Sequence, residues 1–407
     1  MEMPNRIDTA TQFHSVSRNR INTETLASSL AIFWLIALVL GCSPVAPSSS
    51  ITVAVEPPHD GTTALSSQSF GIVVTADQVT AANLAQWKAT RSPVVLKINS
   101  VVNHGKDREA ALAIDQAELQ LDYFIEVARC PEMAAQHPEW MASLQGHPEW
   151  RTLFPDVAKP TARQVIKTQP WVPILYREAF DAHVARIKSL LKNKPSAKRI
   201  WLNDLQAAPS ACGCGHPLCR WTADYGPIKT ATPLDENAAA EFVVAIKQFS
   251  AGAEIIPIFA GECEKEDKDS VCCGVACFEG KCWKAFTRQL DAVAKTNPTI
   301  GVACFYREFD RDLPRYEKTA GWIQYTLDSF STMPSKRDGV GVPAGRLIAV
   351  LQGWDVSSAQ LEAQIERVKE TKALGYLVSL CPIDQSWQPV VYDLPESVVT
   401  DKKHDKK

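Results

Sequence analysis

Eight short apolar segments recur between residues 70 and 380, and their alternation with helix-like stretches limits the possible folds most strongly. Each segment is rich in Val, Ile, Leu or aromatic residues, which is typical of strands buried on both faces. We predict strands at Phe70–Thr75, Pro93–Ile98, Asp122–Val127, Arg199–Leu202, Glu254–Phe259, Ile300–Phe305, Leu347–Leu351 and Tyr376–Leu380. Alternation of this kind indicates a parallel sheet.

The intervening stretches show one apolar face at helical spacing. Three examples are Phe180, Val184, Ile187 and Leu191; Ala239, Phe242, Ile246 and Phe249; and Leu361, Ile365 and Val368. Ser357 and Gln360 have the spacing of a capping box at the start of the third helix. Gly375 is predicted to end that helix.

Eight strand–helix units predict closure into an α/β (β/α)8 TIM barrel with long cysteine-containing loops after its strands. An open doubly wound sheet is the alternative. The first strand is not followed by Gly-x-Gly-x-x-Gly, so the usual dinucleotide site of that fold is missing. A long insertion between Ala128 and Val172 contains His-Pro-Glu-Trp at 137–140 and again at 147–150. Long loops of this kind commonly form a binding site.

The N-terminal segment has the order of an export signal. Basic residues precede an apolar run from Leu30 to Leu40, and Gly41-Cys42 follow. This junction resembles the lipobox of bacterial lipoproteins, in which the cysteine is lipidated. A transmembrane anchor is the alternative, but the run is short of the ~20 residues that span a bilayer.

We therefore expect four parts: a lipoprotein signal peptide (1–41), a flexible Ser- and Pro-containing tether (42–69), the barrel (70–395) and a charged, disordered tail (396–407). Cys42 would attach the exported protein to the membrane of the bacterial cell envelope. Ser43 after the lipidated cysteine favours the outer membrane, by similarity to other lipoproteins.

Eight cysteines fall in the two predicted loops after strands four and five: Cys212, Cys214, Cys219, Cys263, Cys272, Cys273, Cys277 and Cys282. In an exported protein such a set indicates disulfides of undetermined connectivity. A zinc site is the alternative, with the first three thiolates and either His216 or Cys263 as ligands. We expect Cys130, Cys304 and Cys381 to be buried thiols in or beside strands.

Carboxylates and tryptophans dominate the positions where the predicted strands end, which is the catalytic end of a barrel. These positions are Asp77, Asn99, Glu126, Asn203, Asp204, Glu262, Arg307, Glu308, Gln352, Trp354, Asp355, Asp384 and Trp387. Sugars stack on aromatic rings, and two carboxyl groups hydrolyse glycosidic bonds. A carbohydrate ligand is therefore expected. The formal charge of −3, without a basic stripe, argues against nucleic acid, and we expect no cofactor.

From Phe70 to about Pro395 the chain resembles glycoside-hydrolase-like barrels of bacterial lipoproteins, some of which are called family-10-like. The residues that carry the resemblance are the His-Pro-Glu-Trp segments, Leu202-Asn203-Asp204 and the Cys-x-Cys loop. It implies that Asp204 is the general acid/base, in a place where many such enzymes have Glu. Such enzymes often place the nucleophile on strand seven, where this chain has Gln352. The opposing carboxylate would then be Glu308 or Glu262.

The predicted substrate contacts are Asn203, Trp140, Trp150, Arg307, Trp354 and Trp387. The first hypothesis is a glycoside hydrolase acting on an extracellular or envelope polysaccharide by carboxylate acid/base chemistry. The second is a non-catalytic lipoprotein that binds a glycan or a protein, and the third is a zinc-dependent hydrolase. The sugar, its linkage and the oligomeric state are left open by the sequence.

Overall fold

A computed structural model describes residues 68–99, 103–141, 155–161, 163–174, 177–205, 237–260, 283–306, 319–337, 339–383 and 388–393. All of these belong to one compact unit, 63–407. The predicted signal peptide and nearly all of the predicted tether, like the tail, lie outside the described residues, so those boundaries stay predictions. No helix among the described residues is both long enough and apolar enough to cross a membrane.

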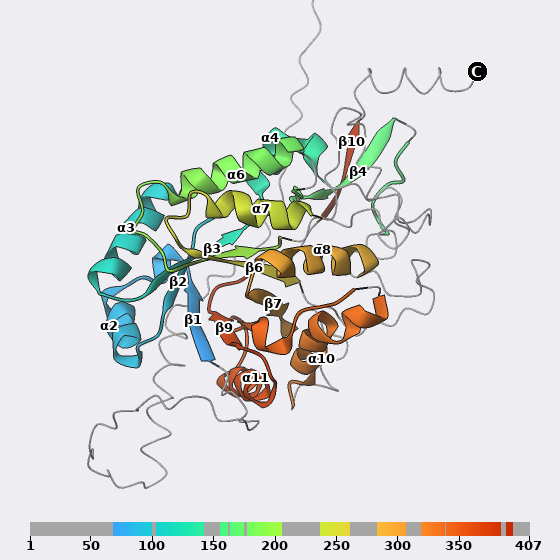
Figure 1. Ribbon diagram of the computed structural model, residues 1–407. Helices are drawn as coiled ribbons and strands as arrows, with labels where there is room; N and C mark the ends of the chain where they lie inside the picture. Colours follow the sequence, from blue (N-terminus) through green and yellow to red (C-terminus); the bar gives the residue numbers. More distant parts are fainter. Residues whose placement is uncertain are drawn as a thin grey trace, which may run out of the picture. The chain divides into compact units, whose positions relative to one another are not determined.

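Eight parallel strands close into a barrel (Figure 1). They are β1 (Gln68–Val74), β2 (Val94–Lys97), β3 (Leu121–Glu126), β5 (Arg199–Asn203), β6 (Glu254–Ala260), β7 (Ile300–Cys304), β8 (Leu347–Gln352) and β9 (Gly375–Ser379). Each strand pairs with the next along the chain, and β9 pairs with β1 to complete the circle. The predicted TIM barrel is confirmed, and every strand boundary lies within two residues of its prediction.

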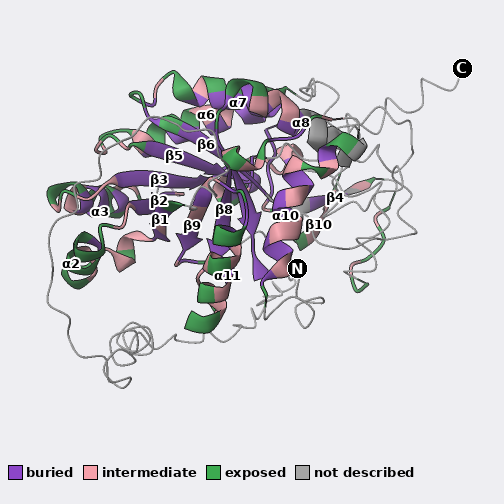
Figure 2. Ribbon diagram, turned by 60° about the horizontal axis from the view of Figure 1, so that its bottom comes forward, coloured by how far each residue is buried: buried purple, intermediate pink, exposed green. Residues whose placement is uncertain are grey.

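Helices cover the outside of the barrel: α2 (Ala81–Thr90), α3 (His104–Gln116), α6 (Arg177–Leu191), α7 (Ala238–Lys247), α8 (Trp283–Thr296), α10 (Gly321–Ser331) and α11 (Ser358–Glu370). Figure 2 shows the buried strands inside and exposed residues on the outer faces of helices such as α2 and α11. The capping box of Ser357 and Gln360 is confirmed at the start of α11.

Gly375 was expected to end that helix, and this prediction is wrong. The helix ends at Glu370, with Thr371 as its cap, and Gly375 is the first residue of β9. It pairs with Gln68 of β1, and a Cβ atom at this position would overlap the carbonyl oxygen of Gln68. Close approach of two strands, rather than a helix end, therefore requires glycine here.

Apolar side chains fill the middle of the barrel. Alternation along a strand sends Asp122, Phe124 and Glu126 of β3 inward, while their neighbours face the helices. Phe124 and Trp201 are fully buried in this interior cluster. The cluster lies between two polar layers, one at the amino ends of the strands and one at their carboxyl ends. We call the carboxyl end of the barrel its mouth.

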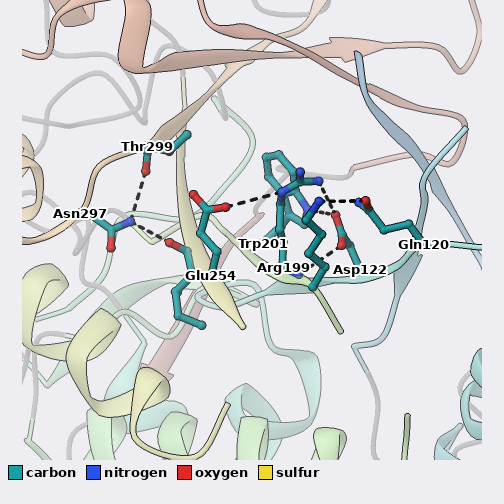
Figure 3. Close-up of polar contacts among 9 residues, drawn as sticks. Gln120, Asp122, Arg199, Trp201, Glu254, Asn297 and Thr299 are labelled. Carbon is teal, nitrogen blue, oxygen red and sulfur yellow. Dashed lines mark hydrogen bonds and ion pairs between the residues drawn. The ribbon is translucent and has the colours of Figure 1, made fainter. Parts of the chain in front are cut away.

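The polar layer at the amino ends is an ion-pair cluster around Arg199 (Figure 3). The Arg199 guanidinium lies 3.2 Å from the Asp122 carboxylate and 3.6 Å from Glu254. It also stacks over the Phe70 ring, 4.9 Å from its centroid. Trp201 Nε1 donates to the same Asp122 oxygen that pairs with Arg199. Burial raises the pKa of Asp122, and the charge of Arg199 opposes that rise.

The insertion after β3 contains secondary structure that sequence analysis missed. It forms α4 (Pro131–Gln136), the short helix η2 (Pro138–Trp140) and β4 (Gln164–Gln169). Strand β4 pairs antiparallel with β10 (Gln388–Asp393), which follows the barrel more than two hundred residues later. The buried Lys167 of β4 donates to the carbonyl groups of Glu139 and Met141, and burial lowers its pKa to about 7. These contacts fix the first His-Pro-Glu-Trp segment against β4.

The amino-end cluster should be structural, because the charges of Arg199 and Asp122 pair with each other in the buried interior. Replacing Asp122 with Leu would leave the buried Arg199 guanidinium with the partly exposed Glu254 as its remaining ion-pair partner among the described residues. We expect the free energy of unfolding in urea to fall by ~3–5 kcal/mol. The control Glu254→Gln should cost less than ~1 kcal/mol, because that carboxylate is 42% exposed. Equal small losses in the two variants would contradict this assignment.

Candidate functional site

Inward-facing polar side chains end several strands at the mouth of the barrel: Lys97 of β2, Glu126 of β3, Asn203 of β5, Gln352 of β8 and Ser379 of β9. Each follows an apolar inward residue two positions earlier in its strand, as alternation requires. The mouth is also where barrel enzymes place their catalytic groups. We therefore take this layer as the candidate site.

Glu126 has contacts at both oxygens of its carboxylate, and 4% of its side chain is exposed. Lys97 Nζ lies 2.8 Å from Oε1, and Asn99 Nδ2 donates to Oε2 at 2.9 Å. The Asn99 side chain also accepts a hydrogen bond from the Glu126 main-chain N–H at 2.9 Å. Two side chains from the end of β2 therefore fix both oxygens of one carboxylate on β3.

Arg186 of α6 supports the same region from outside the barrel. Its guanidinium donates to the main-chain carbonyl groups of Asn99 at 2.9 Å, Glu126 at 2.6 Å and Val127 at 3.2 Å. The residue is 9% exposed. A buried arginine thus connects the ends of β2 and β3 through their backbones, which fixes the position of the residues that follow.

Asn203 and Asp204 stand beside Glu126. In the strand register Asn203 is the direct partner of Glu126, and it is 1% exposed. Its Oδ1 atom accepts no hydrogen bond within the described part of the chain. Asp204 is 6% exposed and has a left-handed backbone with φ of 59°. The chain leaves the strand at this residue, and Leu205 N–H donates to the carbonyl group of Ile258 on β6.

The end of β8 carries an amide and an aromatic ring. Gln352 Nε2 donates to the carbonyl group of Trp354 at 3.1 Å. This bond orients the amide so that its oxygen Oε1 is the free end, and among the described residues Oε1 has no partner. The indole of Trp354 packs against the interior apolar cluster, with the Phe305 ring edge-on at 5.0 Å. Trp354 therefore lies over the apolar centre of the barrel.

The segment after β9 completes the described part of the mouth. Lys97 Nζ reaches it and donates to the carbonyl group of Pro382 at 2.8 Å. Ser379 Oγ donates to the carbonyl group of Cys381 at 2.7 Å. Burial raises the pKa of the Cys381 thiol, against the charge of Lys97. As predicted, Cys381, Cys130 and Cys304 are buried free thiols.

Trp140, predicted as a substrate contact, lies in η2 of the insertion. The ring of His137 stacks on it, with centroids 3.8 Å apart and planes 10° apart. His137 Nδ1 also lies 3.0 Å from the Glu139 carboxylate. One face of this indole is therefore covered by His137, and the indole also packs against the apolar core.

The structure brings Asn203, Asp204 and Trp354 to strand ends at the mouth. Other predicted site residues lie outside the described residues: Glu262, Glu308, Arg307, Trp150, Trp387, Cys42 and the eight loop cysteines. Those roles stay predictions, and so does the zinc alternative. Among the described residues, no three His, Cys, Asp or Glu side chains gather in a way that could hold a metal ion.

Sequence analysis placed Glu126 and Asn99 at strand ends but did not group them, and it missed Lys97. The sequence did contain a pattern that groups Lys97 with Asn99. Val95 and Lys97 alternate along β2, and Asn99 continues this spacing two residues after the strand ends, on the side of apolar Val95.

No family model matches this chain, and no curated protein sequence does. Solved structures do, at low similarity. GH5_18 from Streptomyces cattleya in complex with GlcNAc has a TM-score of 0.36 and 10% identity, over 78% of this chain and 71% of that chain. A β-mannanase from the blue mussel Mytilus edulis has a TM-score of 0.34 and 10% identity, over 74% and 78%.

A chitobiase from Flavobacterium johnsoniae also matches, with a TM-score of 0.34 and 10% identity over 77% of this chain. The match covers only 44% of the chitobiase, so this chain spans less than half of that protein's length. The fold assignment comes from the closed barrel itself and not from these similarities.

His183, one turn before Arg186 in α6, gives a testable pH dependence. It is fully buried, and its Nε2 lies 2.8 Å from the carbonyl oxygen of Val172. Burial, with the nearby charge of Arg186, lowers its pKa from 6.5 to about 3. Between these values the unfolded chain binds a proton that the folded chain does not, so stability falls as the pH falls, by up to ~1.4 kcal/mol per pH unit.

We expect His183→Gln to remove this contribution, because the glutamine amide can still donate to Val172 but does not titrate. The free energy of unfolding, measured in urea from pH 7 to pH 4, should fall less steeply in the variant than in the wild type. If the curves of unfolding free energy against pH are parallel for wild type and variant, His183 binds a proton equally in the folded and the unfolded chain, and this prediction is wrong.

Proposed function

We propose that the mouth of the barrel binds carbohydrate and hydrolyses glycosidic bonds. The observation that supports this most is the composition of the mouth. A carboxylate and two amides, Glu126, Asn203 and Gln352, lie above an apolar centre covered by the indole of Trp354. Sugars present hydroxyl groups at their edges and C–H groups on their faces. Carboxylates and amides accept from the hydroxyl groups, while an indole packs against the C–H face.

The chemistry would need two carboxyl groups. In this proposal Asp204 gives its proton to the glycosidic oxygen as the bond to the anomeric carbon breaks. An opposing carboxylate either takes a proton from the attacking water or first bonds to the anomeric carbon, and water then releases the sugar. Glu308 and Glu262 are the sequence-based candidates for this second group.

The substrate would be an extracellular or envelope polysaccharide, because we also propose that the protein is exported and lipid-anchored. The support is the order of basic segment, apolar run and Gly41-Cys42. Attachment through Cys42, with the 42–69 tether, would place the barrel outside the cytoplasm at the envelope.

A non-catalytic glycan-binding protein is the second candidate. The observation that favours it is Gln352 at the end of β8, an amide at the strand end where such hydrolases often carry the nucleophilic carboxylate. An amide there can bind a sugar hydroxyl group but cannot act as a nucleophile or a base. Turnover distinguishes this candidate from the hydrolase.

For the hydrolase, Asp204→Asn in the full chain should lower kcat by at least ~100-fold, because the amide cannot supply the proton. Release of reducing ends from a panel of polysaccharides and oligosaccharides measures turnover, and calorimetry measures binding of the same sugars. Glu254→Gln, at the opposite end of the barrel, is the control and should keep the wild-type rate.

A wild-type protein that binds a sugar without releasing reducing ends would support the second candidate. Turnover that persists in Asp204→Asn would remove Asp204 from the mechanism. If the wild type neither binds nor cleaves any carbohydrate of the panel, the proposed function is wrong.

The anchor has its own test. In bacterial cells, wild-type protein should incorporate radiolabelled palmitate and sediment with membranes, whereas Cys42→Ser should do neither, because the thiol is the acylation site. Cys381→Ser, which changes a buried thiol of the barrel, is the matched control and should still be labelled. Labelling that survives Cys42→Ser would contradict the lipoprotein proposal.

A further inference from the structure

The Glu126 carboxylate at the mouth is fixed by several contacts, and the stability of the fold alone does not explain them. We call Lys97, Asn99, Glu126 and Arg186 the Glu126 cluster. Its members come from β2 and the segment just after it, from β3 and from α6. Each of the other three contacts Glu126 through its side chain or its backbone. Sequence analysis counted Glu126 among the strand-end carboxylates but did not choose it as a catalytic residue.

Stability alone would not select this arrangement. Burying an ion pair costs desolvation of both charges, and well-packed apolar residues of similar size often stabilise a fold equally or better. The side chains of Lys97 and Glu126 are only 15% and 4% exposed, so this cost applies to them. Neighbouring inward positions on β2 and β3, Val95 and Phe124, show that apolar residues fit the barrel interior.

The hydrogen bonds of Asn99 fix the direction of the carboxylate as well as its place. Its amide N–H and its amide oxygen contact the side chain and the backbone of the same residue, each at 2.9 Å. Rotation of the Glu126 side chain would break the first bond while leaving the second. Preorganised groups of this kind, locked by partners on rigid strands, are typical of residues that meet a ligand.

Lys97 connects the carboxylate across the mouth. Its ammonium group also donates to Pro382 after β9, so it spans from the β3 side to the β9 side. Among the described residues, Lys97 on β2 and the Cys381 thiol after β9 interact electrostatically with Glu126, and Asp204 follows its strand partner Asn203. Arg186 contacts the backbone of the cluster from α6.

We propose that Glu126 is the second carboxylate of the reaction, opposite Asp204, and that Asn99 and Lys97 are its positioning residues. This inference depends on the proposed function and deepens it. Asn203, the direct partner of Glu126 on β5, is followed at once by Asp204, so the two acids come from adjacent strand ends. Glu126 accepts the proton of the attacking water, or bonds to the anomeric carbon, in the step that an opposing carboxylate performs.

The deciding experiment changes one amide into a carboxylate. Asn99→Asp keeps the shape of the side chain but places a second negative charge beside Glu126. Two carboxyl groups at hydrogen-bonding distance resist ionising together, so one of them protonates at higher pH. We expect the acidic limb of the pH profile of kcat/KM to move upward by at least ~1 pH unit.

Asn297→Asp is the matched control. Asn297 is also an asparagine with hydrogen-bonded side-chain N–H groups, donating to two carbonyl groups, but it is more deeply buried than Asn99 and lies in the amino-end region shown in Figure 3. Its substitution should lower stability and leave the acidic limb in place. If Asn99→Asp does not fold, Asn99→Ser takes its place, with an expected ~10–100-fold loss in kcat and little change in KM from misplacement of Glu126.

A direct variant completes the test: Glu126→Gln should lower kcat by at least ~100-fold while still binding the sugar. The inference is wrong if wild type cleaves a sugar while Glu126→Gln keeps its rate, or if Asn99→Asp and Asn297→Asp have the same pH profile. In that case the proposed function still stands with another second carboxylate. Absence of all carbohydrate binding and turnover in the wild type would instead overturn both.

Discussion

The rest of the structure depends on the packing of the apolar layer inside the barrel, around Phe124 and Trp201. Closing eight parallel strands forces half of their side chains into a narrow interior. Apolar side chains fill the middle, so polar ones can lie only at the two ends. Burial of this layer, together with the layer between strands and helices, also explains why the strands are such short apolar runs.

The two polar ends use the same residue types for different purposes. At the amino end, Arg199 lies between Asp122 and Glu254, and its charge is met by the protein itself. At the mouth, Lys97 meets Glu126 in the same way, but two amide oxygens, on Asn203 and Gln352, lack donors among the described residues. A buried acceptor without a donor costs free energy, which a water molecule or a ligand hydroxyl group would recover. Among the described residues, these two atoms without a hydrogen bond at the mouth are thus acceptors, which suit a ligand's hydroxyl groups, whereas those of the amino-end cluster are donors, Arg199 Nε and Gln120 Nε2.

Much of the fold could be predicted from the sequence because buried parallel strands leave a strong signal: a short apolar run bounded by polar residues. The β4–β10 pair could not, since Gln164–Gln169 and Gln388–Asp393 mix polar and apolar residues and pair across more than two hundred positions. Gly375 was misread because glycine serves both helix ends and close strand contacts. In the site, strand ends identified Asn203, Asp204 and Trp354, but the grouping of Lys97, Asn99 and Glu126 depends on inward alternation and on Arg186 from a distant helix.

The central claim is that a ligand binds at the mouth, above the apolar layer and against Glu126. A crystal structure of the Asp204→Asn variant with a sugar from the binding panel tests it most directly. We predict that hydroxyl groups of the sugar lie at hydrogen-bonding distance, ~3 Å, from Glu126 or Asn203, with one ring face against Trp354. A sugar bound on the outer helices or at the amino end of the barrel, with none bound at the mouth, would contradict the account.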